Sequence, residues 1–148
     1  MKTKIGVLKA VLVGVVALAS APAQADIIKH FVRLGAFGVD YNSYAFLTTS
    51  GADTVTFTGS GKFTIWYTAE CAATGYVDVD IIVAGIAVIP TGNNGNDTFC
   101  DPETRGAMHT VTGRTHSLPA GTHSVRIHAR KSVGSFAFLS DSSLLIGK

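Results

Sequence analysis

Apolar and polar side chains alternate with a period of two over much of the chain. From position 62 to position 70 every odd residue is apolar, and this row continues to Cys71, whereas the even residues are mostly polar. Residues 77–83 repeat the alternation and place Asp78 and Asp80 on the face opposite the apolar row. Because successive side chains of a strand point to opposite faces of a sheet, both segments predict strands that bury one face and expose the other.

The same alternation returns in the last third of the chain. Val125, Ile127 and Ala129 alternate with polar residues, and Phe136 and Phe138 repeat the pattern in the next segment. Earlier, Ala84-Gly85 interrupts two apolar runs, which predicts a hairpin between residues 77–83 and 86–89. Further strands are predicted over residues 27–34, 44–48, 54–58, 108–112 and 143–146, with turns over residues 50–53, 59–61, 119–121 and 134–135.

No segment after residue 25 combines a helical period with capping residues. Many short strands separated by glycine-rich turns are typical of a β-sandwich or a β-barrel. Residues 26–148 number 148 − 25 = 123, which is the size of one domain with one core. We therefore predict an all-β fold, an antiparallel β-sandwich that occupies residues 26–148 as a single domain.

Residues 1–25 have the pattern of a secretory signal peptide. Three lysines precede an apolar run from Ala10 to Leu18, and Ala23-Gln24-Ala25 follows as a small-residue cleavage sequence. The apolar run is shorter than the roughly 20 residues that span a bilayer. We expect cleavage after Ala25 and a secreted protein, extracellular or periplasmic and bacterial, with no membrane span after signal removal. The alternative is a retained membrane anchor.

The net charge of +2 belongs to the predicted signal. The whole chain has 12 basic and 10 acidic residues, and removal of three lysines leaves 12 − 3 = 9 basic residues against the same 10 acids. The charge balance therefore gives no reason to expect a nucleic-acid partner.

Cys71 and Cys100 are the two cysteines of the chain. An even number in an exported protein favours a disulfide bond, and two buried free thiols are the alternative. On the chain-entropy model such a bridge stabilises the fold by roughly 3 to 4 kcal/mol. Residues 91–106 are polar and rich in glycine and asparagine, which predicts a surface loop. The bridge would attach this loop to the end of the strand over residues 63–70.

Two segments resemble the closing half of a jelly-roll domain. They are the strand pair over residues 77–89 and, after a variable loop, the segment Leu118-Pro119-Ala120-Gly121-Thr122-His123-Ser124-Val125-Arg126-Ile127. Similar segments open a late strand in secreted carbohydrate-binding modules, in C1q and tumour-necrosis-factor-like domains, and in phage tail-fibre heads. The resemblance covers roughly residues 62–147. It implies a jelly-roll fold, and the C1q-like part implies self-association as a trimer, but it assigns no ligand-binding residue.

Four histidines lie between residues 109 and 128, and imidazole is a common metal ligand. If Pro119-Ala120 forms a two-residue turn, His116 lies opposite His123, and the pair could hold zinc or copper. That register also places Arg114 on the same face as Val125, which is costly where the face is buried. We therefore predict solvated or hydrogen-bonded histidines, with His116 and His123 as the remaining metal candidates.

Several carboxylates offer oxygen ligands for calcium. Asp78 and Asp80 share one face of a strand, and Asp97 and Asp101 lie in the polar loop. Their spacing matches no EF-hand, so a hydrated sheet face and a solvated loop are the alternative to a calcium cofactor. Paired carboxylates also occur in glycosidases, which keeps a small secreted hydrolase as an alternative function. The sequence has no Gly-x-Ser-x-Gly and no His-Glu-x-x-His, so we predict that the chain is not an enzyme.

Trp66, Arg126 and His128 complete the candidate ligand-binding residues. Trp66 lies opposite the apolar row of its strand, where an indole can stack on a sugar ring, and packing under a loop or subunit is the alternative. Arg126 and His128 belong to a basic stripe, which predicts a solvated face or a site for an anionic ligand or partner. The predicted function is therefore a secreted, non-catalytic β-sandwich module that acts by binding or assembly at the cell surface or outside the cell. A glycan-binding, lectin-like module is one alternative, and the partner is a glycan, a protein or further copies of the chain.

Overall fold

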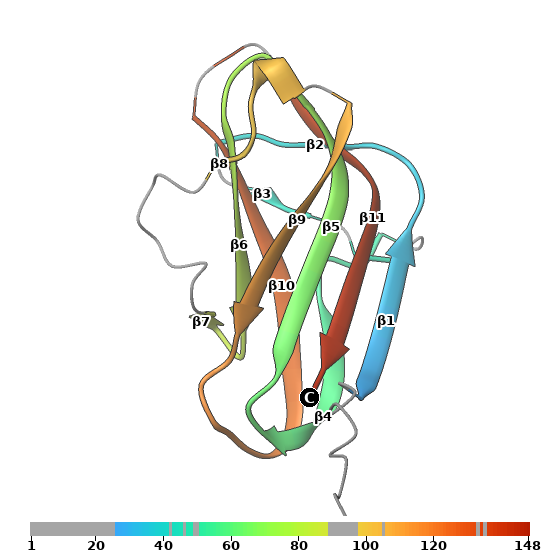
Figure 1. Ribbon diagram of the computed structural model, residues 1–148, viewed down its shortest axis with the longest axis vertical. Helices are drawn as coiled ribbons and strands as arrows, with labels where there is room; N and C mark the ends of the chain where they lie inside the picture. Colours follow the sequence, from blue (N-terminus) through green and yellow to red (C-terminus); the bar gives the residue numbers. More distant parts are fainter. Residues whose placement is uncertain are drawn as a thin grey trace, which may run out of the picture.

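The computed structural model describes residues 26–148, apart from residues 42, 46, 49–50, 89–97, 105, 133 and 135. The predicted signal peptide therefore lies outside the described residues. Among these residues no helix is long and apolar enough to cross a membrane. The elements, drawn in Figure 1, are β1 (Ile27–Arg33), β2 (Phe37–Gly38), β3 (Ser43–Tyr44), β4 (Val55–Gly61), β5 (Thr64–Ala73), β6 (Val77–Val83), β7 (Ile86–Ala87), β8 (Thr98–Cys100), the 3-10 turn η1 (Pro102–Thr104), β9 (Ala107–Arg114), β10 (Leu118–Lys131) and β11 (Ala137–Gly147).

The strands form two antiparallel sheets that pack face to face. Sheet A has the order β1-β11-β5-β9, with β2 also paired to β11. Sheet B has the order β3-β10-β6-β7, with β4 also paired to β10 and β8 to β6. In Figure 1 the two sheets lie one behind the other, with the long strands of each roughly upright. This arrangement is a β-sandwich, whose core lies between the inner faces of the two sheets.

The pairing of the longer strands gives the sandwich its topology. β1 pairs with β11, β4 with β10, β5 with β9, and β6 with β8. Strands of the first half of the chain thus pair with strands of the second half in reverse order. The first strand pairs with the last, and the following pairs move inward along the chain from both ends. That connectivity is the jelly roll. The predicted antiparallel jelly-roll β-sandwich is confirmed.

The predicted alternation of buried and exposed residues is confirmed in the central strands. β5 alternates buried and half-buried side chains along its whole length, and Ile65 and Tyr67 face the core. Ile81 of β6 and Ile127 of β10 lie on the inner face of sheet B. Burial raises the pKa of Tyr67 to about 12, although a hydrogen bond with Ser142 acts in the opposite direction. The Tyr67 phenol is therefore a neutral member of the core at physiological pH.

The predicted disulfide bond between Cys71 and Cys100 is confirmed. It joins β5 of sheet A to β8 of sheet B, with 6.3 Å between the two Cα atoms, and both cysteines are buried. The bridge therefore connects the two layers of the sandwich. It also closes the chain between Cys71 and Cys100 into a loop.

The predicted turns at residues 59–61 and 119–121 are wrong, whereas the hairpin at Ala84-Gly85 is confirmed. Residues 59–61 end β4 and residues 118–121 begin β10, and these two stretches pair with each other. Glycine at position 59 leaves room for the Phe63 ring, because a Cβ there would lie 2.7 Å from it. The register shifts between Leu118 and Gly121, so Pro119, which has no N–H to donate, lies in an irregular part of the ladder.

Strand β11 contains a bulge that reverses which residues face the core. Ala137 and Leu139 are buried before the bulge, whereas Leu144 and Ile146 are buried after it. The register with β5 shifts between Ser140 and Ser143, and Asp141 adopts a φ of 42° within this stretch. The apolar alternation had suggested that Phe136 and Phe138 belong to the buried row, which is wrong, because Ala137 and Leu139 occupy it.

Candidate functional site

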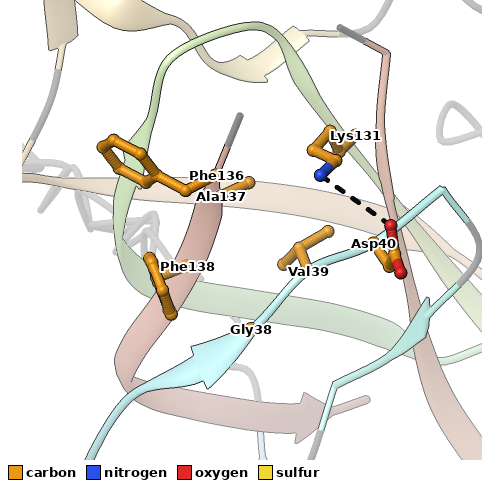
Figure 2. Close-up of a pocket in the computed structure, with 7 residues that line it drawn as sticks. All are labelled: Gly38, Val39, Asp40, Lys131, Phe136, Ala137 and Phe138. Atoms are coloured by element: carbon orange, nitrogen blue, oxygen red, sulfur yellow. Dashed lines mark ion pairs between the residues drawn. The ribbon is translucent and has the colours of Figure 1, made fainter. Parts of the chain in front are cut away.

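An open pocket lies at the end of the sandwich where β10 ends and β11 begins. Its volume is about 320 Å³. Phenylalanine rings lie on one side of it and a charged pair on the other, as Figure 2 shows. The lining residues are Gly38, Val39, Asp40, Lys131, Phe136, Ala137 and Phe138.

The chain between β2 and β3 crosses from one sheet to the other and forms the floor between these two walls. Gly38 pairs with Phe138 of sheet A, and the Val39 amide donates to the Ala137 carbonyl at 2.8 Å. At the next residue, the Asp40 carbonyl accepts a hydrogen bond from the Lys131 amide of sheet B at 3.1 Å. Backbone hydrogen bonds to both sheets therefore fix the position of the pocket residues.

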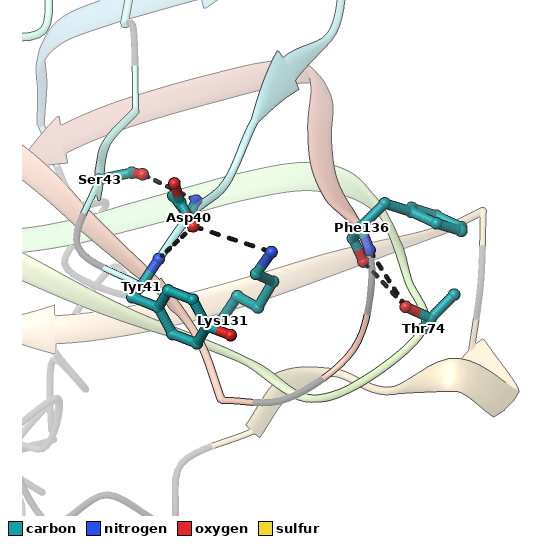
Figure 3. Close-up of polar contacts among 6 residues, drawn as sticks. All are labelled: Asp40, Tyr41, Ser43, Thr74, Lys131 and Phe136. Carbon is teal, nitrogen blue, oxygen red and sulfur yellow. Dashed lines mark hydrogen bonds and ion pairs between the residues drawn. The ribbon is translucent and has the colours of Figure 1, made fainter.

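The aromatic wall is made by Phe136 and Phe138. Their ring centroids lie 5.8 Å apart, and the Phe138 side of the wall is open to solvent, with Phe138 44% exposed. Thr74, in the turn after β5, holds the backbone of Phe136. The Phe136 amide donates to the Thr74 Oγ1 at 3.2 Å, and that hydroxyl lies 3.3 Å from the Phe136 carbonyl, to which it donates (Figure 3). The Thr74 amide also donates to the Phe136 carbonyl, at 3.1 Å. The backbone of Phe136 is thus anchored, and the Phe138 ring is open to solvent.

The polar wall is made by Asp40 and Lys131. The Lys131 Nζ lies 3.8 Å from the Asp40 Oδ1 and 5.1 Å from the centroid of the Tyr41 ring (Figure 3). The Tyr41 amide donates to the same Asp40 oxygen at 3.0 Å, and the Asp40 amide donates to the Ser43 Oγ at 2.8 Å. The Asp40 side chain is 74% exposed, so its second oxygen faces solvent as an acceptor. The pocket therefore offers an apolar surface, a hydrogen-bond acceptor and an ammonium donor together.

A second group of polar residues lies on the outer face of sheet B. The predicted residues Arg126 and His128 of β10 lie beside Tyr44, whose ring is 3.4 Å from the Arg126 guanidinium carbon and 5.1 Å from the His128 ring. The predicted Asp80 of β6 accepts a bond from Arg130 at 3.0 Å, and its oxygen lies 4.0 Å from His128. The structure thus brings Arg126, His128 and Asp80 together, and in the same register Asp78 lies opposite Arg130.

Two groups at this outer face, His128 and Asp53, have lowered pKa values. The pKa of His128 is below its ordinary value of 6.5, first because burial disfavours the imidazolium and second because Arg130 repels it, although Asp80 acts in the opposite direction. The pKa of Asp53 is also lowered, first by a hydrogen bond from Thr54 and then by the hydrogen bond from Arg126. His128 is therefore neutral and Asp53 ionised at neutral pH.

We expect His128 to make the protein less stable in mild acid. Because its folded-state pKa lies below 6.5, the unfolded chain takes up the proton first as the pH falls. The stability that neutral His128 provides is complete above pH 6.5 and decreases as the pH falls through its folded-state pKa. Urea unfolding at pH 7.5 and pH 5.5 should show a smaller loss of unfolding free energy in His128→Gln than in the unmodified protein. An equal or larger loss in the variant contradicts this assignment.

Trp66 and Asp101, the other predicted ligand-binding residues that the structure describes, lie in different parts of the fold. Trp66 is half-buried on the outer face of sheet A, where its ring covers Gly147, so that a Cβ on Gly147 would lie 2.9 Å from it. The Asp101 Oδ1 accepts a bond from the Glu103 amide at 2.9 Å, at the start of η1. Asp97 lies outside the described residues. In the part of the chain that the structure describes, no three His, Cys, Asp or Glu side chains form a group that could hold a metal ion.

The predicted geometry for His116 and His123 is wrong. His123 is buried, and its Nε2 lies 3.0 Å from the Pro119 carbonyl and 3.2 Å from the Gly59 carbonyl. His116 is exposed in the connection before β10. Because residues 118–123 form a strand that pairs with β4, no turn folds His116 back across from His123.

The sequence predictions missed the pocket residues. Asp40 and Lys131 are 91 positions apart, and Phe136 and Phe138 had the spacing of core residues. One signal was present: the apolar positions Leu139 and Leu144 are an odd number of residues apart, which a regular strand cannot bring to one face. If both leucines are buried in one strand, this spacing requires a bulge between them. With Leu139 facing the core, Phe136 and Phe138 then lie on the outer face.

The chain has distant structural similarity to known proteins and no detected sequence relative. No protein-family model and no curated protein matches it. A carbohydrate-binding module of lichenase 5A from Cellvibrio mixtus, solved with cellotriose, is 16% identical over 83% of this chain and 98% of that one, with a TM-score of 0.38. The VP2 subviral particle of infectious bursal disease virus is 16% identical over 95% of this chain, with a TM-score of 0.41, and latent PorU from Porphyromonas gingivalis is 17% identical over 84%, with a TM-score of 0.40. The chain spans 37% of the length of VP2 and 13% of that of PorU. At these values no ligand, activity or residue role is transferred.

Proposed function

We propose that this chain is a non-catalytic β-sandwich binding module, and that its ligand is a carbohydrate bound in the end pocket. The supporting observation is the exposed Phe138 ring facing the Asp40–Lys131 pair across an open pocket of about 320 Å³. Pockets of this size suit small ligands when a few polar groups accompany an apolar lining. The module acts outside the cytoplasm, in agreement with the buried disulfide bond.

A sugar ring has the complementary chemistry. Its C–H face packs on an aromatic ring, where it loses contact with water, and its hydroxyl groups donate to a carboxylate and accept from an ammonium. Phe138 supplies the aromatic ring, Asp40 supplies the carboxylate, and Lys131 supplies the ammonium. Because backbone hydrogen bonds hold these residues in place, binding would need little rearrangement.

The test is a glycan array with the purified protein, followed by titration calorimetry with the oligosaccharide that binds best. We expect Phe138→Ala to weaken binding about tenfold or more, which corresponds to the 1.4 kcal/mol or more that an aromatic contact and its buried area provide. Asp40→Asn, which keeps the shape and removes the charge, should weaken binding by a smaller factor.

Two further variants make the result specific. Ile27→Ala removes an apolar side chain on β1 that is 66% exposed, against 44% for Phe138, and should leave the affinity unchanged. Trp66→Ala tests the outer face of sheet A. If Trp66→Ala abolishes binding while Phe138→Ala does not, the sugar binds on that face and the proposed site is wrong. Absence of any array ligand contradicts the proposed function itself.

A further inference from the structure

A second hollow lies at the opposite end of the sandwich from the candidate pocket. It has a volume of about 440 Å³ and is lined by Lys62, Arg114, Thr115, His116 and Ser117. Lys62 lies in the connection between β4 and β5. The other residues lie at the end of β9 and in the connection from β9 to β10. Both connections lie at the lower end of the molecule in Figure 1, whereas β2 and the start of β11 lie at the upper end.

A pair of buried residues fixes the arrangement of this hollow. The Phe63 amide donates to the Thr115 Oγ1 at 2.9 Å, and the Thr115 amide donates to the Phe63 carbonyl at 2.9 Å. Both residues are buried, so their chain neighbours point to the outside. Lys62 precedes Phe63, and Arg114 and His116 flank Thr115. The two hydrogen bonds therefore bring the backbone of these three residues together, so their side chains line one hollow.

The hollow has positive charge and no acidic lining residue. Lys62 and Arg114 are exposed, and the ion pairs found among the described residues involve other basic side chains. Two cations held near each other repel, and an anion between them removes that repulsion. Residues 26–148 contain 9 basic and 10 acidic residues, so their net charge is not positive. The positive charge of the hollow is therefore a property of this part of the surface alone.

We infer that this hollow is a binding site for an oxyanion group, a sulfate, phosphate or carboxylate. Arg114 presents a planar fork of N–H donors that matches two oxygens of such a group, and Lys62 adds a compact ammonium. The Ser117 hydroxyl and a His116 ring nitrogen supply further hydrogen bonds. The site is separate from the end pocket, and the inference does not depend on the proposed carbohydrate binding.

The test is an NMR titration of the purified, ¹⁵N-labelled protein with sodium sulfate and with sodium phosphate, with ionic strength kept constant by sodium chloride. We expect saturable shifts of the amides of residues 114–117, and no shift of the amides around residues 38–40. The double variant Lys62→Gln/Arg114→Gln should bind about tenfold more weakly or not at all, since it lacks both charge-assisted bonds. Its spectrum without added anion reports whether it is folded.

Lys29→Gln is the control for charge, and it removes one positive charge where the double variant removes two. Lys29 is exposed on β1, at the edge of sheet A opposite β9, so its removal changes the net charge without touching the hollow. Equal weakening in Lys29→Gln and in the double variant, or shifts that do not saturate with either anion, would overturn the inference.

Glucose 6-sulfate and glucose 6-phosphate then identify the source of the group. Tighter binding of these sugars than of the inorganic ions assigns the site to a substituent of a glycan, and equal binding assigns it to the free anion. Both results support an oxyanion site. Because the reporting amides lie at the end of the sandwich opposite the pocket, a failure here is distinguishable from a failure of the proposed carbohydrate site.

Discussion

Phe57→Ala is expected to lose about 3 to 5 kcal/mol of unfolding free energy, a large part of the stability of a domain of this size. Phe57 of β4 is 1% exposed. Its ring contacts the Phe63 ring edge to face at 4.8 Å and lies 5.5 Å from the His123 ring. Truncation removes these contacts and leaves a cavity between the sheets that neighbouring side chains can only partly fill. Urea unfolding monitored by circular dichroism measures the loss.

The matched control for this substitution is Phe138→Ala, which deletes the same atoms at a position that is 44% exposed. Its loss should be much smaller, because the ring is only partly removed from water in the folded state. If Phe57→Ala does not fold, Phe57→Leu keeps most of the volume and should cost less than about 1.5 kcal/mol. A loss for Phe57→Ala as small as that expected for Phe138→Ala would contradict this prediction.

Removal of the disulfide bond is expected to lower the unfolding free energy by about 3 to 4 kcal/mol on the chain-entropy model. Cys71 and Cys100 are 29 positions apart, so the bridge restricts a loop of moderate length in the unfolded chain. The variant Cys71→Ala/Cys100→Ala removes the bond and little volume. Its urea unfolding should begin at a clearly lower concentration than that of the unmodified protein.

Reductant provides the control for this prediction. Dithiothreitol should destabilise the unmodified protein to a similar extent and leave the double variant unchanged, because the variant has no bond to reduce. A double variant within about 1 kcal/mol of the unmodified protein would mean that native strain or residual structure in the unfolded chain offsets the entropic gain.

The fold class followed from the sequence because its signal is local and repeated. The row that includes Ile65 and Tyr67 shows the two-residue period of a strand, and Ile127 continues the same pattern in β10. The two errors at residues 59–61 and 119–121 have a common cause. Glycine and proline usually mark turns, but here the glycines lie in paired strands: Gly59 pairs with Gly121, and Gly61 pairs with Leu118. The close approach of the Phe63 ring to position 59 requires a residue without a side chain there.

The site was less accessible to sequence reasoning because its residues are joined only by the tertiary fold. Asp40 and Lys131 meet through a backbone hydrogen bond between distant segments. Phe138 faces outward because of the bulge near Asp141, which no local propensity specifies. By contrast, Arg126 and His128 were correctly placed beside each other, since both lie on one regular strand and share a face.

The chain from Gly38 to Asp40 connects the two layers of the sandwich and has a further consequence. The aromatic wall of the end pocket belongs to sheet A and the Lys131 side to sheet B, so the width of the pocket is set by the separation of the sheets. A ligand that contacts both walls binds across the layers and opposes their separation. Ligand affinity and the free energy of unfolding are then thermodynamically linked. A substitution that changes the core volume far from the pocket would also change the width of the pocket, and with it the fit of the ligand.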